Sequence, residues 1–256
     1  MGKIINFFLR KINLMLIKKK TFNKILKKIN DVIILDLLKV SKRENLENII
    51  KNIQYSQSQL AQDLFVLNEF NFKKNGFFVE FGACDGVLHS NTHILEKKFD
   101  WQGILCEPAN SFHKIIRTNR NCHIENKCVY SDSGKTLDFN EFSNEGELSG
   151  LSNIGIKNIF KKKSTYKVQT ISLNDLLKKY SCPRNFDYLS IDTEGSEFEI
   201  INNLDFSNHR PKIISIEHNY NTNKRKKIFD LLSKNNYLRV YTHISDWDDW
   251  YISENI

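Results

Sequence analysis

The stretch FFVEFGACDGVLHSNTHILEKKF, residues 77–99, begins as an apolar run, breaks at two glycines and continues with helical spacing. The residues before Gly82 predict a buried strand, and the segment from Asn91 predicts a helix. Gly82 allows the chain to turn sharply after the strand, and Gly86 permits positive φ and a close approach of the backbone to a ligand. A strand, a glycine turn and a helix N-terminus in this order predict a ligand site at the carboxyl end of the strand.

Strand and helix patterns alternate over most of the 256 residues. Apolar strand candidates lie at 77–81, 103–106, 123–130, 186–191, 212–217 and 237–242, and helical patterns lie at 91–99, 109–118, 172–180 (with Ser172 as N-cap), 195–203 and 223–234. This alternation predicts an α/β fold with a mostly parallel sheet and helices on both faces. The polar stretch 143–165 interrupts the pattern, either as a lid or substrate loop or as a disordered surface insertion.

The net charge of +8 is concentrated at the N-terminus. Residues 1–30 hold nine Lys and Arg and no acidic residue, which leaves 29 basic and 30 acidic residues, a net −1, in the rest of the chain. The overall basicity therefore does not indicate nucleic-acid binding.

Residues 1–30 also show one apolar face at helical pitch, with lysines on the other face. The apolar stretch is broken by Arg10 and Lys11, so it is too interrupted to span a bilayer. Such a basic amphipathic helix either makes a peripheral contact with an anionic membrane surface or packs its apolar face on the domain.

Five cysteines occur, and no two of them are spaced as CxxC. This usage predicts reduced thiols in a cytoplasmic protein rather than a disulfide framework or a zinc site.

The acidic residue before the first glycine narrows the class of ligand. The pattern Glu80-x-Gly82-x-x-x-Gly86 is neither the GxGxxG of dinucleotide sites nor a phosphate loop. A carboxylate there would repel a pyrophosphate but suits a cation, such as the ammonium group of S-adenosylmethionine. The next strand candidate, in WQGILCEP, ends at Glu107, 21 residues after Gly86, where a carboxylate can accept both hydroxyls of a ribose.

From about Ser56 to its end the chain resembles the FkbM-type S-adenosylmethionine-dependent methyltransferases. The resemblance rests on SQSQLAQDLFVL (56–67), GFFVEFGACDGVLHSNTHILEKKFDWQGILCEP (76–108), FDYLSIDTEGSEFEII (186–201) and IISIEHN (213–219). It implies a Rossmann-like class I methyltransferase fold over 56–256, with a seven-stranded sheet and a final antiparallel strand at WDDWYI (247–252). Residues 1–55 would form an N-terminal helical extension.

The resemblance also implies a cofactor and roles for individual residues. S-adenosylmethionine would be the cofactor, and a hydroxyl of a sugar, glycan or related small molecule would be the acceptor. The methionine side of the cofactor would be held by Glu80, Gly82, Cys84, Asp85 and Gly86, the ribose by Glu107, the adenine by Ser131 and Asp132, and the sulfonium would lie beside Asp192. Cys84 stands where the family more often has Asn.

A sugar hydroxyl is a poor nucleophile, so its methylation benefits from a general base. His218, at the end of IEHN, is one candidate, although a structural role for this histidine is equally compatible with its position. Asp192 and Glu194 are the other candidates. Together with Glu217 they could also gather around a divalent cation, but nothing in their spacing requires it, so no metal is predicted.

Two other functions remain open at this point. A nicotinamide-dependent oxidoreductase would share the fold class, but the missing GxGxxG counts against it. A membrane-surface binding protein with a lapsed methyltransferase domain is the second, and the intact glycine and acidic positions count against it. The sequence indicates neither the acceptor nor an oligomeric state.

If residues 1–30 form a surface anchor, the full chain will co-sediment with anionic vesicles, and its deletion variant lacking 1–30 will not. Each Lys or Arg near such a surface contributes about 1 kcal/mol within a Debye length, so binding should weaken strongly in high salt. A deletion variant that instead becomes insoluble or melts at lower temperature would show that the apolar face packs on the domain.

Overall fold

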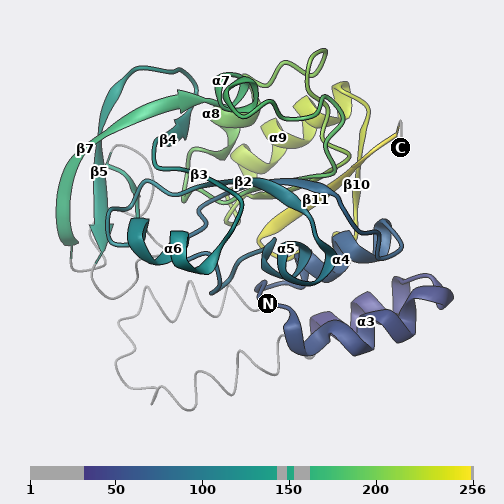
Figure 1. Ribbon diagram of the computed structural model, residues 1–256. Coiled ribbons are helices and arrows are strands. Elements are labelled where there is room, and N and C mark those ends of the chain that lie inside the picture. Colours follow the sequence, from purple (N-terminus) through teal and green to yellow (C-terminus); the bar gives the residue numbers. More distant parts are fainter. Residues whose placement is uncertain (1–31, 143–148, 153–161, 255–256) are drawn as a thin grey trace, which may run out of the picture.

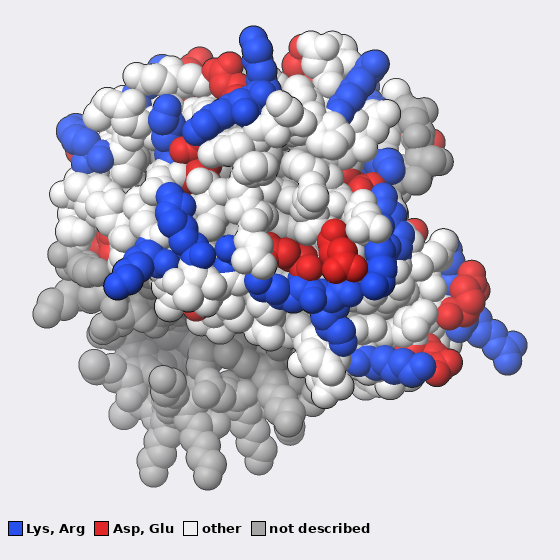
Figure 2. Space-filling model, viewed as in Figure 1, with Lys and Arg blue, Asp and Glu red and all other residues white. Residues whose placement is uncertain are grey.

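The computed structural model describes residues 32–142, 149–152 and 162–254 (Figure 1). The amphipathic helix predicted at 1–30 lies outside these residues, as does most of the polar stretch 143–165. Within the described ranges, no helix combines the length and apolar character that crossing a membrane requires. On the face shown in Figure 2, basic side chains lie among acidic and neutral ones, as the near-zero charge outside the N-terminal segment predicts.

A seven-stranded sheet with the order β10-β11-β9-β8-β1-β2-β3 forms the centre of the molecule. Its strands are β1 (Phe77–Phe81), β2 (Gln102–Cys106), β3 (His123–Glu125), β8 (Tyr188–Ile191), β9 (Ile213–Glu217), β10 (Tyr237–Val240) and β11 (Asp248–Ser253). Neighbours from β3 to β9 are parallel, whereas β11 runs antiparallel to both β9 and β10. The α/β class, the seven strands and the reversed strand at 247–252 are confirmed.

Helices cover both faces of this sheet (Figure 1). They are α4 (Gln62–Glu69), α5 (His93–Phe99) and α6 (His113–Asn119) on one face, and α7 (Leu173–Lys179), α8 (Glu197–Ile201) and α9 (Thr222–Lys234) on the other. Each set buries its apolar side chains in a separate cluster against the sheet. The Ser172 hydroxyl accepts the N–H of Asp175 and caps α7, as predicted. The ends of the other elements differ from the predicted ends by a few residues.

Helical turns precede α4. Residues 32–40 are helical and are followed by a 3-10 turn at Arg43–Asn45, by α3 (Leu46–Asn52) and by a second 3-10 turn at Ile53–Tyr55. Ile33, Leu37 and Ile49 are buried in the same cluster as the apolar residues of α4. This described part of the N-terminal extension therefore belongs to the core of the domain.

A second sheet, which the sequence analysis missed, flanks the first. Its strands are β4 (Cys128–Tyr130), β5 (Thr136–Phe142), β6 (Gly150–Leu151) and β7 (Lys162–Ser172), in the order β4-β7-β5-β6. β5 and β7 pair as long antiparallel strands at the left of Figure 1. The end of the stretch predicted to be a loop, from Lys162 onward, is therefore strand.

The prediction of one strand over 123–130 is wrong. β3 pairs with β2 in the main sheet, whereas β4 pairs with β7 in the second sheet. The break lies at 126–127, where the Glu125 carboxylate accepts the N–H of Lys127 and also the Lys179 ammonium group. This turn directs the chain out of the first sheet.

Aromatic stacking joins α4 to the reversed strand β11. The rings of Phe65 and Trp250 lie 4.5 Å apart with an interplanar angle of 15°, and the Gln62 amide donates to the Asp248 carboxylate at 2.8 Å. Both aromatic side chains are fully buried. The contact fixes the start of the domain against its end.

Phe65→Ala should therefore lower the free energy of unfolding by about 3–5 kcal/mol, because it removes a fully buried ring that its surroundings cannot replace. Chemical denaturation followed by circular dichroism measures this loss. Phe229→Ala, on the exposed side of α9, is the matched control and should cost much less. Equal losses in the two variants would contradict the assigned role of the stack.

Candidate active site

A pocket lies at the carboxyl ends of the parallel strands. Three groups of residues line it: those at the ends of β1 and β2, those of the second sheet, and those of the turn after β8. They are Phe81, Gly82, Cys84, Cys106, Glu107 and Pro108; Cys128, Val129, Phe139, Ser149, Gly150 and Leu151; and Asp192, Thr193, Glu194 and Ser196. Five residues predicted for the site are therefore brought together here: Gly82, Cys84, Glu107, Asp192 and Glu194.

At both glycines of the turn after β1 the backbone is closely approached, as the sequence predicts. The approaching group, however, is another part of the chain. Gly82 has φ +76°, and a Cβ atom there would lie 2.0 Å from the carbonyl oxygen of Asp192. Gly86 has φ +80°, and a Cβ atom there would lie 2.7 Å from Cγ of Arg120. The neighbour of Gly86 is thus a buried arginine rather than a ligand. We call residues 82–86 the glycine loop.

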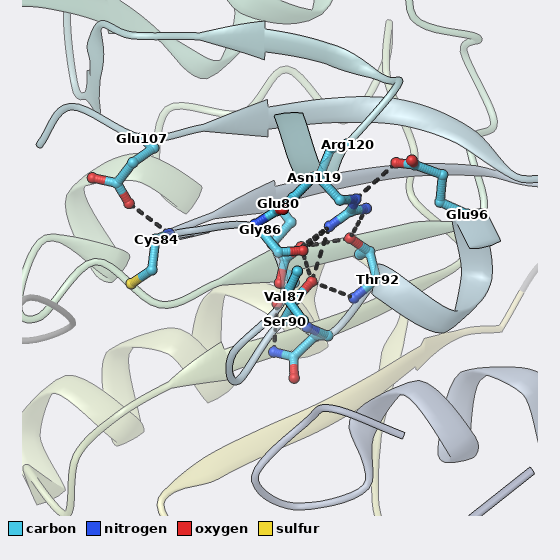
Figure 3. Close-up of polar contacts among 12 residues, drawn as sticks. Glu80, Cys84, Gly86, Val87, Ser90, Thr92, Glu96, Glu107, Asn119 and Arg120 are labelled. Carbon is cyan, nitrogen blue, oxygen red and sulfur yellow. Dashed lines mark hydrogen bonds and ion pairs between the residues drawn. The ribbon is translucent and has the colours of Figure 1, made fainter. Parts of the chain in front are cut away.

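Glu107 follows β2 and points into the pocket beside the glycine loop (Figure 3). One carboxylate oxygen accepts the N–H of Cys84 and the other accepts the N–H of Ala109, both at 2.7 Å. The residue is only 4% exposed. Burial raises the pKa of Glu107 to about 7, against the two N–H donors, and the nearby Glu141 carboxylate adds to the rise.

Glu80 does not take the position that the sequence analysis assigned to it. Its carboxylate accepts the Asn91 N–H at 2.6 Å and the hydroxyls of Ser90 and Thr92, and it lies 3.9 Å from a guanidinium nitrogen of Arg120 (Figure 3). Glu80 is buried, and the residues that line the pocket do not include it. Its oxygens hold the chain after the glycine loop on β1, so the geometry does not support a contact with a cationic ligand.

Four further residues predicted to bind the cofactor, Asp85, Gly86, Ser131 and Asp132, also lie outside the pocket lining. The Asp85 carboxylate accepts the N–H groups of Val87 and Leu88, both at 2.8 Å, and so shapes the end of the glycine loop. Ser131 and Asp132 are in the turn after β4, where the Ser131 hydroxyl donates to the Asp132 carboxylate. The residues of β4 that do line the pocket are Cys128 and Val129, a few positions before the pair predicted to flank the adenine.

Carboxylates gather where β8 and β9 end. One oxygen from each of Asp192, Glu194 and Glu217 lies within 4.8 Å of the others. Glu194 has φ +56°, a conformation that costs energy in a residue with a side chain and that recurs at functional sites. Lys224 of α9 reaches the Glu197 carboxylate at 2.6 Å. Burial acts to lower the pKa of Lys224, but the carboxylates of Glu197, Glu217 and Asp192 raise it overall.

His218 is poorly placed to act as a general base. Its side chain is 1% exposed, and its Nδ1 accepts the N–H of Tyr220 at 3.0 Å. In the neutral ring the proton therefore sits on Nε2, which lies 3.9 Å from the Asp249 carboxylate. Burial lowers the pKa of His218 to about 4. Since the lone pair is already engaged, the structural role is the one that the geometry supports.

The pocket also contains residues that sequence reasoning missed. Phe139 of β5 and Leu151 of β6 line it, and a Cβ atom at Gly150 would lie 3.6 Å from the carbonyl oxygen of Thr193. The second sheet thus reaches the turn that carries the carboxylates. The alternation in TLDFNEF (136–142) is the period-two signal that could have revealed β5.

Comparisons with known proteins identify the family of the chain. The profile of the Methyltransferase FkbM domain matches residues 80–243. The chain belongs to the FkbM methyltransferase family. Among solved structures it is similar to the methyltransferase FkbM from Methylobacillus flagellatus KT, with 12% identity and a TM-score of 0.47 over 87% of this chain and 58% of that one. It is also similar to precorrin-6y C5,15-methyltransferase from Geobacter metallireducens GS-15, with 14% identity and a TM-score of 0.38 over 70% and 71%. A search of curated proteins found no match.

Membership of this family implies S-adenosylmethionine as the methyl donor, and the alternative of a nicotinamide-dependent oxidoreductase is set aside. The chain spans 58% of the length of the FkbM protein of known structure named above. The pocket fits the cofactor in its donor set, because Glu107 offers a buried carboxylate at the ribose position of such folds. All five cysteines lie in the described ranges and are thiols.

Affinity for S-adenosylhomocysteine should rise with pH from 6 to 8 in the wild-type chain. Burial raises the pKa of Glu107 to about 7, and only the ionised carboxylate can accept hydrogen bonds from both ribose hydroxyls. Glu107→Gln should lose this pH dependence and bind at least about tenfold more weakly at pH 8, since charge-assisted hydrogen bonds contribute about 1.5–3 kcal/mol each. Calorimetric titration at several pH values measures both effects. A folded variant with wild-type affinity at pH 8 would refute the ribose contact.

Proposed function

We propose that this FkbM methyltransferase transfers the methyl group of S-adenosylmethionine to a hydroxyl of a sugar, glycan or related small molecule. The observation that carries the proposal is the position of Asp192 and Glu194. Both line the same pocket as Glu107, across from it on the turn after β8. Carboxylates accept hydrogen bonds from the hydroxyls of a substrate, and they can take up the proton that methylation of a hydroxyl releases.

In this proposal, different residues of the pocket contact different parts of the cofactor. The Glu107 carboxylate would accept hydrogen bonds from the ribose hydroxyls. An apolar wall beside the adenine would be formed by Cys128, Val129 and Leu151. The Gly82 turn leaves the pocket without a side chain at that point. The cofactor supplies a methyl group that is already activated on a sulfonium, so the main task of the chain is to align the acceptor.

The carboxylate cluster provides the acceptor side. Asp192 directly follows β8, and the left-handed backbone of Glu194 holds its carboxylate beside it. Lys224 pairs with Glu197, and the carboxylates of Glu217 and Asp192 also raise its pKa, so its positive charge offsets part of the negative charge of the cluster. Either Asp192 or Glu194 would accept the proton of the hydroxyl, and the others would hold the remaining hydroxyls of a sugar.

A cation-assisted version of the same reaction is the second candidate. Asp192, Glu194 and Glu217 bring their oxygens within 4.8 Å of one another, and three carboxylates are a donor set that Mg²⁺ or Mn²⁺ accepts. A cation there would lower the pKa of a bound hydroxyl in place of a protein base.

Asp192→Asn and Glu194→Gln distinguish the assignments. Loss of the general base should lower turnover by about a hundredfold or more with cofactor affinity nearly unchanged. His218→Asn is the control and should retain turnover within a few-fold, because the ring is buried away from the pocket. Transfer of a labelled methyl group to glycan extracts measures turnover.

Chelation with EDTA separates the two versions of the reaction. Turnover that survives chelation supports a carboxylate base, whereas turnover that is lost and then restored by Mg²⁺ or Mn²⁺ supports the cation. If His218→Asn abolishes turnover and both carboxylate variants retain it, the assignment of the base is wrong.

A further inference from the structure

Two consecutive residues at the end of α6 donate hydrogen bonds to the backbone of the glycine loop. The Asn119 amide donates to the carbonyl oxygen of Asp85 at 2.8 Å, and the Arg120 guanidinium donates to the carbonyl oxygen of Gly86 at 3.0 Å (Figure 3). Both bonds go to backbone atoms, so they fix the orientation of two successive peptide planes of the loop. Within the described part of the chain, neither Asn119 nor Arg120 lines the pocket.

Arg120 is fully buried and uses its donors on several partners at once. Besides Gly86 it donates to the Glu96 carboxylate at 2.8 Å and to the hydroxyls of Ser90 and Thr92 at 3.1 and 2.9 Å. A planar guanidinium with five N–H donors can satisfy such a set, whereas an ammonium group cannot match its geometry.

The hydroxyls of Ser90 and Thr92 link this arginine to Glu80. Each hydroxyl accepts a bond from Arg120 and donates its own proton to the Glu80 carboxylate. The direction of every bond is therefore set, from the guanidinium through the hydroxyls to the carboxylate. A buried positive charge and a buried negative charge are held 3.9 Å apart with all these intervening groups satisfied.

The other side of the glycine loop is held by Glu107. The N–H of Cys84 donates to the Glu107 carboxylate, one residue before Asp85. The loop is thus clamped between β2, through Cys84, and α6, through Asp85 and Gly86. A displacement of Asp85 or Gly86 would be carried along the short loop toward Cys84, whose N–H orients the Glu107 carboxylate.

We propose that Asn119 and Arg120 are positioning residues for the cofactor: they fix the glycine loop so that Glu107 meets the ribose in one orientation. This inference rests on the proposed cofactor site. It explains why Gly86 is a glycine, since a side chain there would collide with Arg120. It also predicts that cofactor affinity depends on a residue that does not touch the cofactor.

Asn119→Ala is the main test, because it deletes one hydrogen bond to the loop from a half-buried helix end. S-adenosylhomocysteine should bind at least about fivefold more weakly, the equivalent of one lost hydrogen bond. Arg120→Lys keeps the charge but loses most of the bonds, and should weaken binding further. Arg117→Ala is the matched control on the same helix: Arg117 is exposed and donates to Asn126. Calorimetry, thermal melting and amide hydrogen exchange are measured on the full chain.

The exchange pattern distinguishes positioning from general support of the fold. Positioning predicts faster exchange in Asn119→Ala at residues 83–90, with wild-type exchange in β9 and a melting temperature close to that of the control. Wild-type affinity in Asn119→Ala would overturn the inference, and so would a loss of affinity accompanied by faster exchange over the whole chain. If the wild-type chain itself does not bind S-adenosylhomocysteine, the proposed cofactor site fails and this inference fails with it. Wild-type binding with unchanged variants overturns the inference alone.

Discussion

The structure around the site depends on one buried carboxylate in the middle of the sheet. Glu80 lies in β1, which has parallel neighbours on both sides, and it is removed from water almost completely. Burial raises the pKa of Glu80, although Arg120 and the donors of residues 90–92 act to lower it. Such a group is tolerated only where its surroundings supply donors, and here the supplying segment is the one that follows the glycine loop. The need to satisfy Glu80 therefore determines where the chain runs after β1 and how α5 begins.

The geometry of the pocket depends on a contact between the turn after β1 and the turn after β8. β1 ends at the Gly82 turn, and the carbonyl oxygen of Asp192 occupies the space where a side chain would be. The turn that would hold the cofactor and the turn that carries Asp192 and Glu194 are therefore in direct contact. A change in one must be transmitted to the other, because packed backbone cannot be compressed. This explains how two segments 110 residues apart in the chain (82 and 192) form one site.

The sequence predicted those features that rest on period and on strand ends. The parallel strands, the glycine turn and the position of Glu107 are local patterns, and the structure contains all of them. The reversed strand at 247–252 was implied by the family resemblance, and it is present as well. It could not predict where a side chain finds its partner. Glu80 pairs through Ser90 and Thr92 with an arginine 40 residues later, and nothing in the local pattern marks Arg120. The second sheet was missed because the polar composition around 143–165 obscured the strands on either side of it.

His218 and Glu194 show how burial separates residues that look alike in sequence. Both follow strands at the same edge of the sheet, and both can accept a proton. His218 turns inward, where its Nδ1 accepts a backbone N–H, and burial lowers its pKa to about 4. Glu194 adopts a left-handed backbone and lines the pocket beside Asp192. Glu194 thus presents a carboxylate to the pocket, whereas His218 is not among the residues that line it. Our proposal therefore places the proton acceptor on the turn after β8, with Glu217 at the end of β9 as the third carboxylate of the cluster.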